Sequence, residues 1–374
     1  MEIQTRTTKA PSARIAGLDG LRGLAALLVL LNHMSLNGLF LLPGLDFIGL
    51  GKPAVYLFFN LSAFLLTSQL WNWTDERLRS PRCWLGYLTG RVFRIWPLFM
   101  LYVITSFLTS EYGPAVLRGQ GLPETISAQE LIQTLSLQRG QGTVLWTIPV
   151  EFKFYLLLPA IILILTLVLR RSIVQGSILV ALSAAACFAL IPPASWGASP
   201  TPFLGVFLTG VLAALTHQSL IRRTRPISPA LFERLAWLAA LALVLITPAV
   251  ARQFTGMTVP GEYLSKALLP CSILWFVMIL GMLHGTGMMR RLLDLKTFVG
   301  LGTVSYSLYL CHMTVLKITV WPKLPLGPYA RAWLSVAAAI ALAAASFAIV
   351  EAPGISLGAR VRRLLIGGQA PAGS

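Results

Sequence analysis

Long apolar stretches separated by short polar segments recur along the whole chain. Each stretch is close to the roughly 20 residues that an α-helix needs to cross a bilayer. The pattern therefore predicts an all-α fold, a polytopic membrane helix bundle of about ten transmembrane helices. We expect these helices at residues 18–40, 53–71, 93–110, 144–169, 173–191, 201–218, 234–250, 262–284, 298–320 and 331–350.

Composition and charge indicate the surroundings of the chain. Of its 374 residues, 56% are hydrophobic and only 11% are charged, which excludes an ordinary soluble domain. Most of the 30 Lys and Arg residues fall on the side of the predicted helices that also holds both termini. The positive-inside rule then places both termini in the cytoplasm and residues 111–142 outside, with one short helix at 128–135. We assign the net charge of +17 to topology and anionic lipid, and expect no nucleic acid as a partner.

One membrane domain accounts for nearly the whole chain. We expect it at residues 16–355, between a cytoplasmic N-terminal tail at 1–15 and a basic cytoplasmic C-terminal tail at 356–374. The extreme ends, 1–14 and 367–374, are expected to be disordered. The first apolar run carries charge and has no small-residue cleavage site, so we expect a retained span in a multi-pass protein of the inner or plasma membrane. The four cysteines form no CxxC pair, so neither a disulfide framework nor a metal site is predicted.

The first predicted span carries a polar stripe. At about 100° and 1.5 Å per residue, Arg22 and His33 lie about 20° apart around the helix axis and about 16 Å apart along it, and Asp19 falls on the same stripe. Ionisable groups at membrane depth cost roughly 2.5–3.5 kcal/mol on insertion scales and usually face a protein interior. A span reaching Phe40 places His33 at mid-membrane. Because histidine exchanges protons near neutral pH, we predict that His33 is catalytic rather than a structural hydrogen-bonding group.

Two further spans place charge in or beside the bilayer. Arg91 and Arg94 lie one turn apart at the cytoplasmic end of the third predicted helix, so both guanidinium groups point the same way and suit an anionic phosphate. A basic membrane anchor is the alternative interpretation. Glu151 lies in the outer half of the fourth predicted helix, with Tyr155 on the same face. The alternative for Glu151 is a structural carboxylate paired with a neighbouring helix.

The ninth predicted helix has a polar face. Ser305, Tyr309 and His312 lie within about 60° of one another around its axis. We assign Ser305 and Tyr309 to the binding of a co-substrate, with helix–helix hydrogen bonding as the alternative. We assign no role to His312. Asn60 and Ser62 interrupt the second predicted span and are interpreted as packing residues.

Three further ionisable residues lie at the ends of predicted helices. Glu351 closes the tenth helix at the cytoplasmic edge, just before Pro353, where we expect it to cap the helix or to pair with an arginine. His217 and His284 fall at the cytoplasmic ends of the sixth and eighth predicted helices. We expect both histidines to be interfacial.

The segments that carry these residues resemble, in their order along the chain, the integral membrane acyltransferase-3 family, whose members O-acylate sugars, cell-envelope polysaccharides and some macrolide antibiotics. The resemblance runs from about Ala16 to Pro353. It departs at Ala63, where the family usually has glycine, and no hydrolase-like domain is appended, so we do not expect a two-stage relay to a distant polymer. The matching segments are LDGLRGLAALLVLLNH, FFNLSAFLL, RVFRIWP, WTIPVEF, SYSLYLCH and VEAP.

The resemblance assigns roles to five residues. It implies His33 as the catalytic histidine, Arg22 as its partner, Arg91 and Arg94 as the acyl-CoA site, and Glu151 as the glutamate required in the fourth helix.

The residues and the resemblance together imply a membrane-embedded O-acyltransferase. It would move an acyl group, expected to be acetyl, from acyl-CoA to a hydroxyl of a sugar, polysaccharide precursor or macrolide-like acceptor. Acyl-CoA (acetyl-CoA) is a co-substrate, no cofactor is bound permanently, and the other partners are the hydroxylated acceptor (a glycan, glycolipid or macrolide) and the lipid bilayer. Neutral His33 would act as general base on the acceptor hydroxyl, while Glu151 orients the imidazole or holds the acceptor. An acyl-histidine intermediate stays open as a variant.

Two other classes of protein also stay open. A transporter or flippase of a sugar-lipid would use His33 and Glu151 as a proton relay. Such a protein would release no free thiol from acyl-CoA, whereas an acyltransferase would. A scaffold or assembly subunit would leave the converging ionisable residues unexplained.

Overall fold

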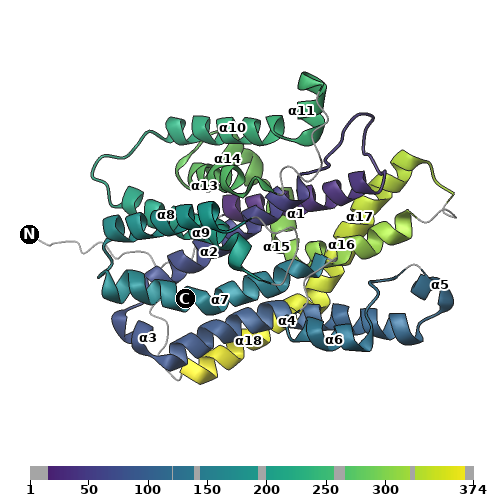
Figure 1. Ribbon diagram of the computed structural model, residues 1–374, viewed down its shortest axis with the longest axis horizontal. Helices are drawn as coiled ribbons and strands as arrows, with labels where there is room; N and C mark the ends of the chain where they lie inside the picture. The colour runs from purple at the N-terminus through teal and green to yellow at the C-terminus, as the bar shows by residue number, and fades with distance from the viewer. Residues whose placement is uncertain are drawn as a thin grey trace, which may run out of the picture.

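Helices are the only regular secondary structure in the part of the chain that the computed structural model describes (Figure 1). The all-α prediction is therefore confirmed for those residues. The extreme ends that were expected to be disordered lie outside them. The described residues are 16–119, 121–138, 144–192, 199–256, 266–320 and 325–366.

Short connections join most of the successive helices. Two 3₁₀ turns, η1 (Val144–Trp146) and η3 (Thr201–Phe203), precede α7 and α9, and two π-helical turns, η2 (Ile164–Val168) and η4 (Phe347–Glu351), follow α7 and α17. The α-helices are α1 (Ala16–Leu36), α2 (Gly51–Trp71), α3 (Asp75–Arg79), α4 (Pro81–Tyr112), α5 (Ala115–Gly119), α6 (Ala128–Leu135), α7 (Thr147–Leu163), α8 (Ile173–Leu190), α9 (Leu204–Ile221), α10 (Pro229–Leu245), α11 (Pro248–Thr255), α13 (Leu268–His284), α14 (Met288–Leu293), α15 (Lys296–Thr303), α16 (Ser305–Thr319), α17 (Pro328–Ser346) and α18 (Ala352–Ile366).

Every predicted transmembrane stretch contains a helix, but fewer than ten are both long and apolar. Among the described residues, six helices have the length and hydropathy to cross a membrane, and α15 with α16 makes a seventh if this bent pair is one span. Helix α13 is apolar but shorter. The structure thus supports a multi-pass membrane protein, while ten crossings and cytoplasmic termini stay predictions.

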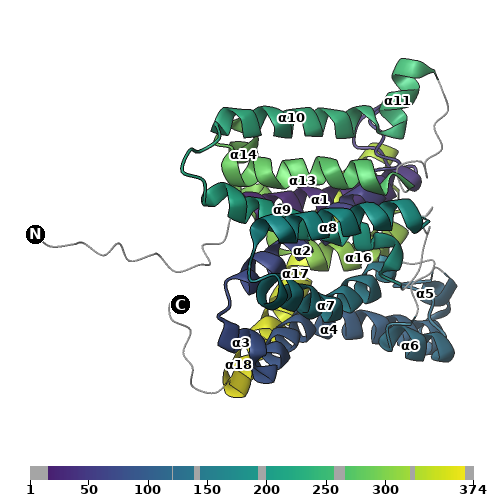
Figure 2. The same cartoon turned by 60° about the vertical axis from the view of Figure 1, so that its left-hand side comes forward.

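The two ends of the bundle carry different segments. Figures 1 and 2 both place α3 and the end of α18 at the end opposite α5 and α6. Helix α6 forms where the short outer helix was predicted, and Ser127 and Glu130 make a capping box at its start. This arrangement is the one expected if residues 111–142 and the termini lie on opposite sides of the membrane.

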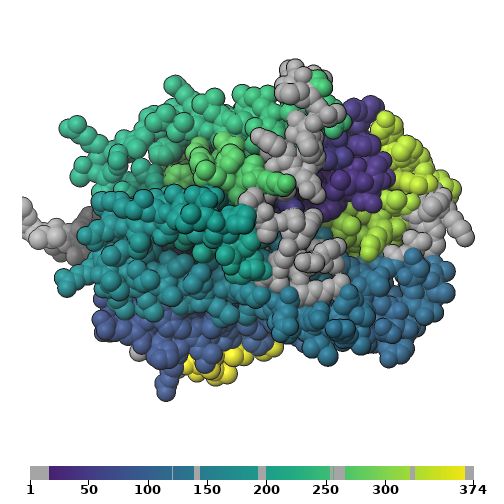
Figure 3. Space-filling model, viewed as in Figure 1, coloured from purple at the N-terminus to yellow at the C-terminus, as the bar shows by residue number. Residues whose placement is uncertain are grey.

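The outer surface of the bundle is apolar. Helices α8 and α10, teal and green on the face shown in Figure 3, expose Ile178, Leu182, Leu238 and Leu241. Large apolar side chains exposed in this number are unfavourable in water but match the acyl chains of a bilayer. These helices therefore face lipid.

The first helix ends at Leu36, before the Phe40 expected from the sequence. Gly38 adopts a left-handed φ of 71°, and the N–H of Leu39 donates to the carbonyl five residues back. This is the Schellman arrangement, in which a glycine after the last turn terminates the helix. His33 therefore lies in the last turn of α1, closer to the helix end than the sequence indicated, while its depth in the membrane stays a prediction.

The third predicted span begins earlier than residue 93. Helix α4 starts at Pro81, and proline is common at the first position of a helix because its missing N–H would have no partner there. The added turns pack against α18, where a Cβ on Gly86 would lie 2.9 Å from Cδ1 of Ile366. Arg91 and Arg94 consequently lie well inside a helix, and their expected position at a helix end is wrong.

The last helix does not stop at Pro353. The π-helical turn η4 ends at Glu351, and α18 continues the same helix to Ile366. The wider turn accommodates a proline that has no N–H to donate. Glu351 is 1% exposed, so the prediction that it closes a helix at the cytoplasmic edge is wrong. Residues 356–366, which were assigned to the C-terminal tail, are helical and pack on α4.

Glycines bring α1 close to α14 and α15. A Cβ on Gly23 would lie 2.2 Å from the carbonyl oxygen of Phe298, and a Cβ on Gly20 would lie 1.9 Å from that of Leu293. Only glycine permits so close an approach of two helix backbones. The LDGLRG segment therefore fixes the position of α1 in the bundle and, with it, the position of Arg22.

Candidate active site

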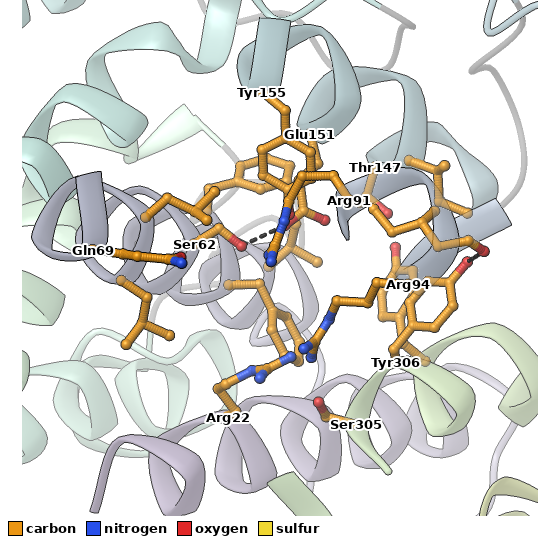
Figure 4. A pocket seen from close by; sticks show the side chains of 18 residues that line it. Arg22, Ser62, Gln69, Arg91, Arg94, Thr147, Glu151, Tyr155, Ser305 and Tyr306 are labelled. Carbon is orange, nitrogen blue, oxygen red and sulfur yellow. Dashed lines mark hydrogen bonds between the residues drawn. The ribbon is translucent and has the colours of Figure 1, made fainter. Parts of the chain in front are cut away.

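A cavity lies between α1, α2, α4, α7 and α16 and offers about 160 Å³ to the centres of water molecules. Helices far apart in the sequence contribute its polar lining. These side chains are Arg22 from α1, Ser62 and Gln69 from α2, Arg91 and Arg94 from α4, Thr147, Glu151 and Tyr155 from α7, and Ser305, Tyr306 and Tyr309 from α16 (Figure 4).

Three arginines make the cavity cationic. Figure 4 shows the guanidinium groups of Arg22 and Arg94 pointing toward one another, with that of Arg91 directed into the same space. The Nε atom of Arg91 is buried and has no hydrogen-bond partner among the described residues. Guanidinium groups bind phosphate oxygens through paired N–H donors, and gathered positive charges repel one another unless an anion neutralises them. The arrangement suits a ligand that carries several phosphate oxygens.

Glu151 is held at the cavity wall by two hydroxyl groups. Ser62, from α2, and Tyr155, one turn further along α7, both donate hydrogen bonds to its carboxylate. Neither bond reaches His33. Glu151 therefore makes no hydrogen bond to His33 in the described structure, and its expected role in orienting the imidazole gains no support from these contacts. Its alternative role, holding the acceptor, stays a prediction.

A second carboxylate lies near the arginines. Glu351 accepts a hydrogen bond from the hydroxyl of Ser307 at 2.8 Å. Arg94 and Arg22 are close enough to act on it electrostatically. Among the described residues, Glu351 makes no ion pair with an arginine, and its Oε1 atom is buried without a hydrogen-bond partner, so arginine pairing stays a prediction. A buried carboxylate at this position offsets part of the repulsion among the guanidinium groups.

Helix α16 forms one end of the cavity. It meets α15 at an angle of 78°. Its first residue, Ser305, lines the cavity together with the arginines. The positive end of the helix dipole at this position adds to the positive charge of the arginines. The hydroxyl of Tyr306 donates to the carbonyl of Ile95, and that of Tyr309 donates to the carbonyl of Val144, both at 2.9 Å. These bonds tie α16 to α4 and to the turn before α7.

His33 does not line the cavity and instead contacts His312, from α16. Nδ1 of His33 lies 3.1 Å from Nε2 of His312, and the ring centroids are 4.9 Å apart. Tyr309 joins this pair to the cavity, because it lines the cavity and its ring centroid is 6.0 Å from that of His312. Arg22 and His33 share α1, but they do not contact each other in the described structure.

The other two histidines also contact each other. Nδ1 of His217 lies 3.1 Å from Nε2 of His284, and their ring centroids are 5.1 Å apart. Both side chains are half-buried. The expectation that each is simply interfacial therefore missed their contact, which joins the ends of α9 and α13.

The cavity gathers every predicted site residue except His33, although their roles stay predictions. Cavity residues that were not predicted from the sequence include Ser62, which was interpreted as a packing residue, and Tyr306, in the polar segment of α16. The polar interruption of the second span was the one available signal for Ser62.

Ala63, the departure from the family pattern, packs against Gly210 of α9, where a Cβ added to Gly210 would lie 2.8 Å from the Cβ of Ala63. The small residue needed for this helix contact is thus on the partner helix.

An all-helical bundle with an apolar outer surface and a cationic internal cavity defines a membrane protein suited to an anionic ligand. The family model of the acyltransferase domain matches residues 15–351. The chain therefore belongs to the acyltransferase-3 family and is an acyltransferase. No curated protein and no solved structure matches the chain.

Proposed function

We propose that this acyltransferase moves an acyl group, expected to be acetyl, from acyl-CoA to a hydroxyl of a sugar, polysaccharide precursor or macrolide-like acceptor. The convergence of Arg22, Arg91 and Arg94 on one cavity is the observation that carries the proposal. Acyl-CoA bears a 3′-phosphate and a pyrophosphate, and three guanidinium groups match that charge. The family supplies the reaction class, and the arginines supply the reason to choose this donor.

The donor would extend along α1. Arg22 and His33 lie about 16 Å apart along this helix. The nucleotide end of acyl-CoA would stay at the arginines, while the flexible pantetheine arm passes Tyr309 and brings the thioester to His33. In the predicted topology the last turn of α1 faces the outer side of the membrane, so the acceptor hydroxyl would approach His33 from there.

The reaction needs one proton carrier. Nε2 of His33 takes the proton of the acceptor hydroxyl while the oxygen attacks the thioester carbonyl carbon. The carbon–sulfur bond then breaks, and the proton passes from His33 to the departing sulfur. One ester forms for each thioester cleaved, and free CoA is released. In the variant route His33 itself accepts the acyl group first, and radiolabel retained on the protein after mixing with labelled acetyl-CoA alone would identify that route.

Free thiol is the product that tests the proposal. The full-length protein in nanodiscs is mixed with acetyl-CoA and a lipid and glycan extract of the source cells, and thiol release is followed over time. We expect release that requires both the protein and the extract, and mass spectrometry of the extract then identifies the acylated acceptor. If the protein neither binds acetyl-CoA nor releases thiol with any fraction of the extract, this donor is wrong.

A further inference from the structure

His312 has no part in the reaction as written above, yet it is the side chain that contacts His33. It is 1% exposed. Its Nδ1 atom lies 2.7 Å from the carbonyl oxygen of Tyr309 and 3.2 Å from that of Leu308. Carbonyl oxygens only accept hydrogen bonds, so Nδ1 of His312 carries the hydrogen. A neutral imidazole has one N–H, and therefore Nε2 of His312 holds a lone pair.

The same reasoning fixes the state of His33. Its Nδ1 atom lies 2.9 Å from the carbonyl oxygen of Val29 and 3.1 Å from Nε2 of His312. Both neighbours accept, so Nδ1 of His33 carries a hydrogen that the two acceptors share. Nε2 of neutral His33 is then unprotonated, and no described residue hydrogen-bonds to it. This nitrogen is the one that a general base must present to a hydroxyl.

The bonds run in one direction, from His33 to His312 and on to the carbonyl of Tyr309. When Nε2 of His33 takes a proton, its Nδ1–H becomes a stronger donor to His312, which in turn donates more strongly to the backbone. The positive charge is thereby spread over two rings. In many enzymes a carboxylate orients a histidine in this way. Among the described residues, however, no carboxylate hydrogen-bonds to either ring of this pair.

We propose that His312 is a positioning residue for His33. It holds the ring of His33 with Nε2 free and stabilises the imidazolium that forms when the acceptor hydroxyl is deprotonated. The inference rests on the proposed function, since it assigns a partner to the base of that reaction. It also explains why Glu151, which bonds Ser62 and Tyr155, is not needed for this task.

Two substitutions separate this role from packing. His312→Leu keeps similar bulk and removes the acceptor, whereas His312→Gln offers an amide oxygen to Nδ1 of His33. We expect His312→Leu to lower kcat roughly tenfold to a hundredfold, the range found when the hydrogen-bond partner of a metal-bound histidine is removed. Acetyl-CoA binding should stay unchanged, and His312→Gln should recover part of the lost rate. His217→Leu, the same change in the other histidine pair, is the matched control and should leave kcat unchanged.

The tautomers give a readout that does not depend on turnover. The chain has only four histidines, so nitrogen-15 spectra of the histidine-labelled full-length protein in nanodiscs can be assigned with single variants. We expect His33 and His312 both to be protonated at Nδ1 at neutral pH, and the His33 signals to shift in His312→Leu. If the wild-type protein released no thiol, the proposed function would be rejected. The arrangement of the His33–His312 pair would still be decided by the spectra.

Three results would overturn the role of His312. The first is a spectrum that shows His33 protonated at Nε2. The second is a His312→Leu variant whose kcat stays within a few-fold of wild type while His33→Gln is inactive. The third is a His312→Gln variant that binds acetyl-CoA normally but is as slow as His312→Leu.

Discussion

The two histidine pairs of this protein make nearly the same contact in different surroundings. In His33–His312 and in His217–His284, Nδ1 of one ring lies 3.1 Å from Nε2 of the other, with ring centroids 4.9 and 5.1 Å apart. In the first pair, backbone carbonyls accept from both Nδ1 atoms and set the direction of the hydrogen bonds. In the second pair, no carbonyl of the described chain accepts from either ring.

The neighbours of the two pairs differ as well. The first pair is joined through Tyr309 to a cavity with three arginines. The second pair lies among phenylalanines, with the ring of Phe64 6.0 Å from that of His217 and the ring of Phe232 5.0 Å from that of His284. A contact between two imidazoles is thus no sign of catalysis by itself. A defined proton direction, a free ring nitrogen and a nearby cationic cavity distinguish the first pair.

The pairs also lie at different depths. Asn32, next to His33, accepts a hydrogen bond from the N–H of Gly49, two residues before α2 begins. The ring of His217 instead packs on Phe64, 13 residues after the first residue of α2. Between Gly51 and Phe64 this helix rises by about 20 Å. In the predicted topology the first pair is therefore close to the outer face and the second is close to the cytoplasmic face.

Reporter fusions test these depths with an all-or-none signal. A reporter that is active only outside the cytoplasm should be active when fused after Gly121 and inactive when fused after Gly368. The expectation follows from the excess of arginine on the side of the termini. Equal activity at both positions would contradict the topology, and the reverse pattern would exchange the faces assigned to the two pairs.

Substitution of His33 should have the largest effect on rate. General-base catalysis is worth roughly a 10²–10⁴-fold rate effect, so His33→Ala should abolish detectable thiol release from acetyl-CoA while expression and folding persist. His33→Gln keeps hydrogen-bonding capacity and similar bulk but cannot take up a proton near neutral pH, and it should be equally inactive. His217→Gln should retain wild-type activity. An active His33→Gln variant would show that His33 only forms hydrogen bonds and takes up no proton during the reaction, so that the first pair, like the second, has a structural role.

Neutralising the cavity arginines should weaken donor binding. Hydrogen bonds to charged groups contribute about 1.5–3 kcal/mol, so Arg91→Gln and Arg94→Gln should each raise the Kd for acetyl-CoA roughly tenfold or more. Binding to the wild-type protein should also weaken at high ionic strength because salt screens the charges. Arg363→Gln, on the exposed end of α18, removes the same charge and should leave binding unchanged. Unaltered binding in both cavity variants would make these arginines topological anchors only.

The smallest effect is expected in the second pair. His217→Leu removes one hydrogen bond between half-buried side chains, which is worth about 0.5–1.5 kcal/mol of stability. We expect a small decrease in Tm in detergent and a rate of acyl transfer within twofold of wild type. A loss of activity comparable to that of His312→Leu would erase the distinction between the pairs.

The features best predicted from the sequence were the helices and the residues that share a helix face, because the thickness of the bilayer and the helix period determine them. A membrane-length apolar stretch must satisfy its backbone internally, so the helices were predictable, and the spacing of Arg91 and Arg94 placed both on one face. Contacts between helices were not predictable, because rotations set by close approaches such as that of Gly23 decide them. His33 and His312, 279 residues apart, are the clearest case. The end of α1 had a readable signal in Asn37–Gly38 that the apolar residues after it obscured.

The bend of 78° between α15 and α16 has a mechanical consequence. Helix α16 begins with Ser305 at the cavity and carries His312, two turns further on, against His33. This one short helix thus borders the proposed donor site and, through His312, contacts the proposed base His33. Any displacement of its first turn by an arriving donor also moves His312. Because α15 and α16 meet at an angle at Val304, α16 could shift when a ligand occupies the arginine-lined cavity. Such a shift would change the contact between His312 and His33 and, with it, the reactivity of His33.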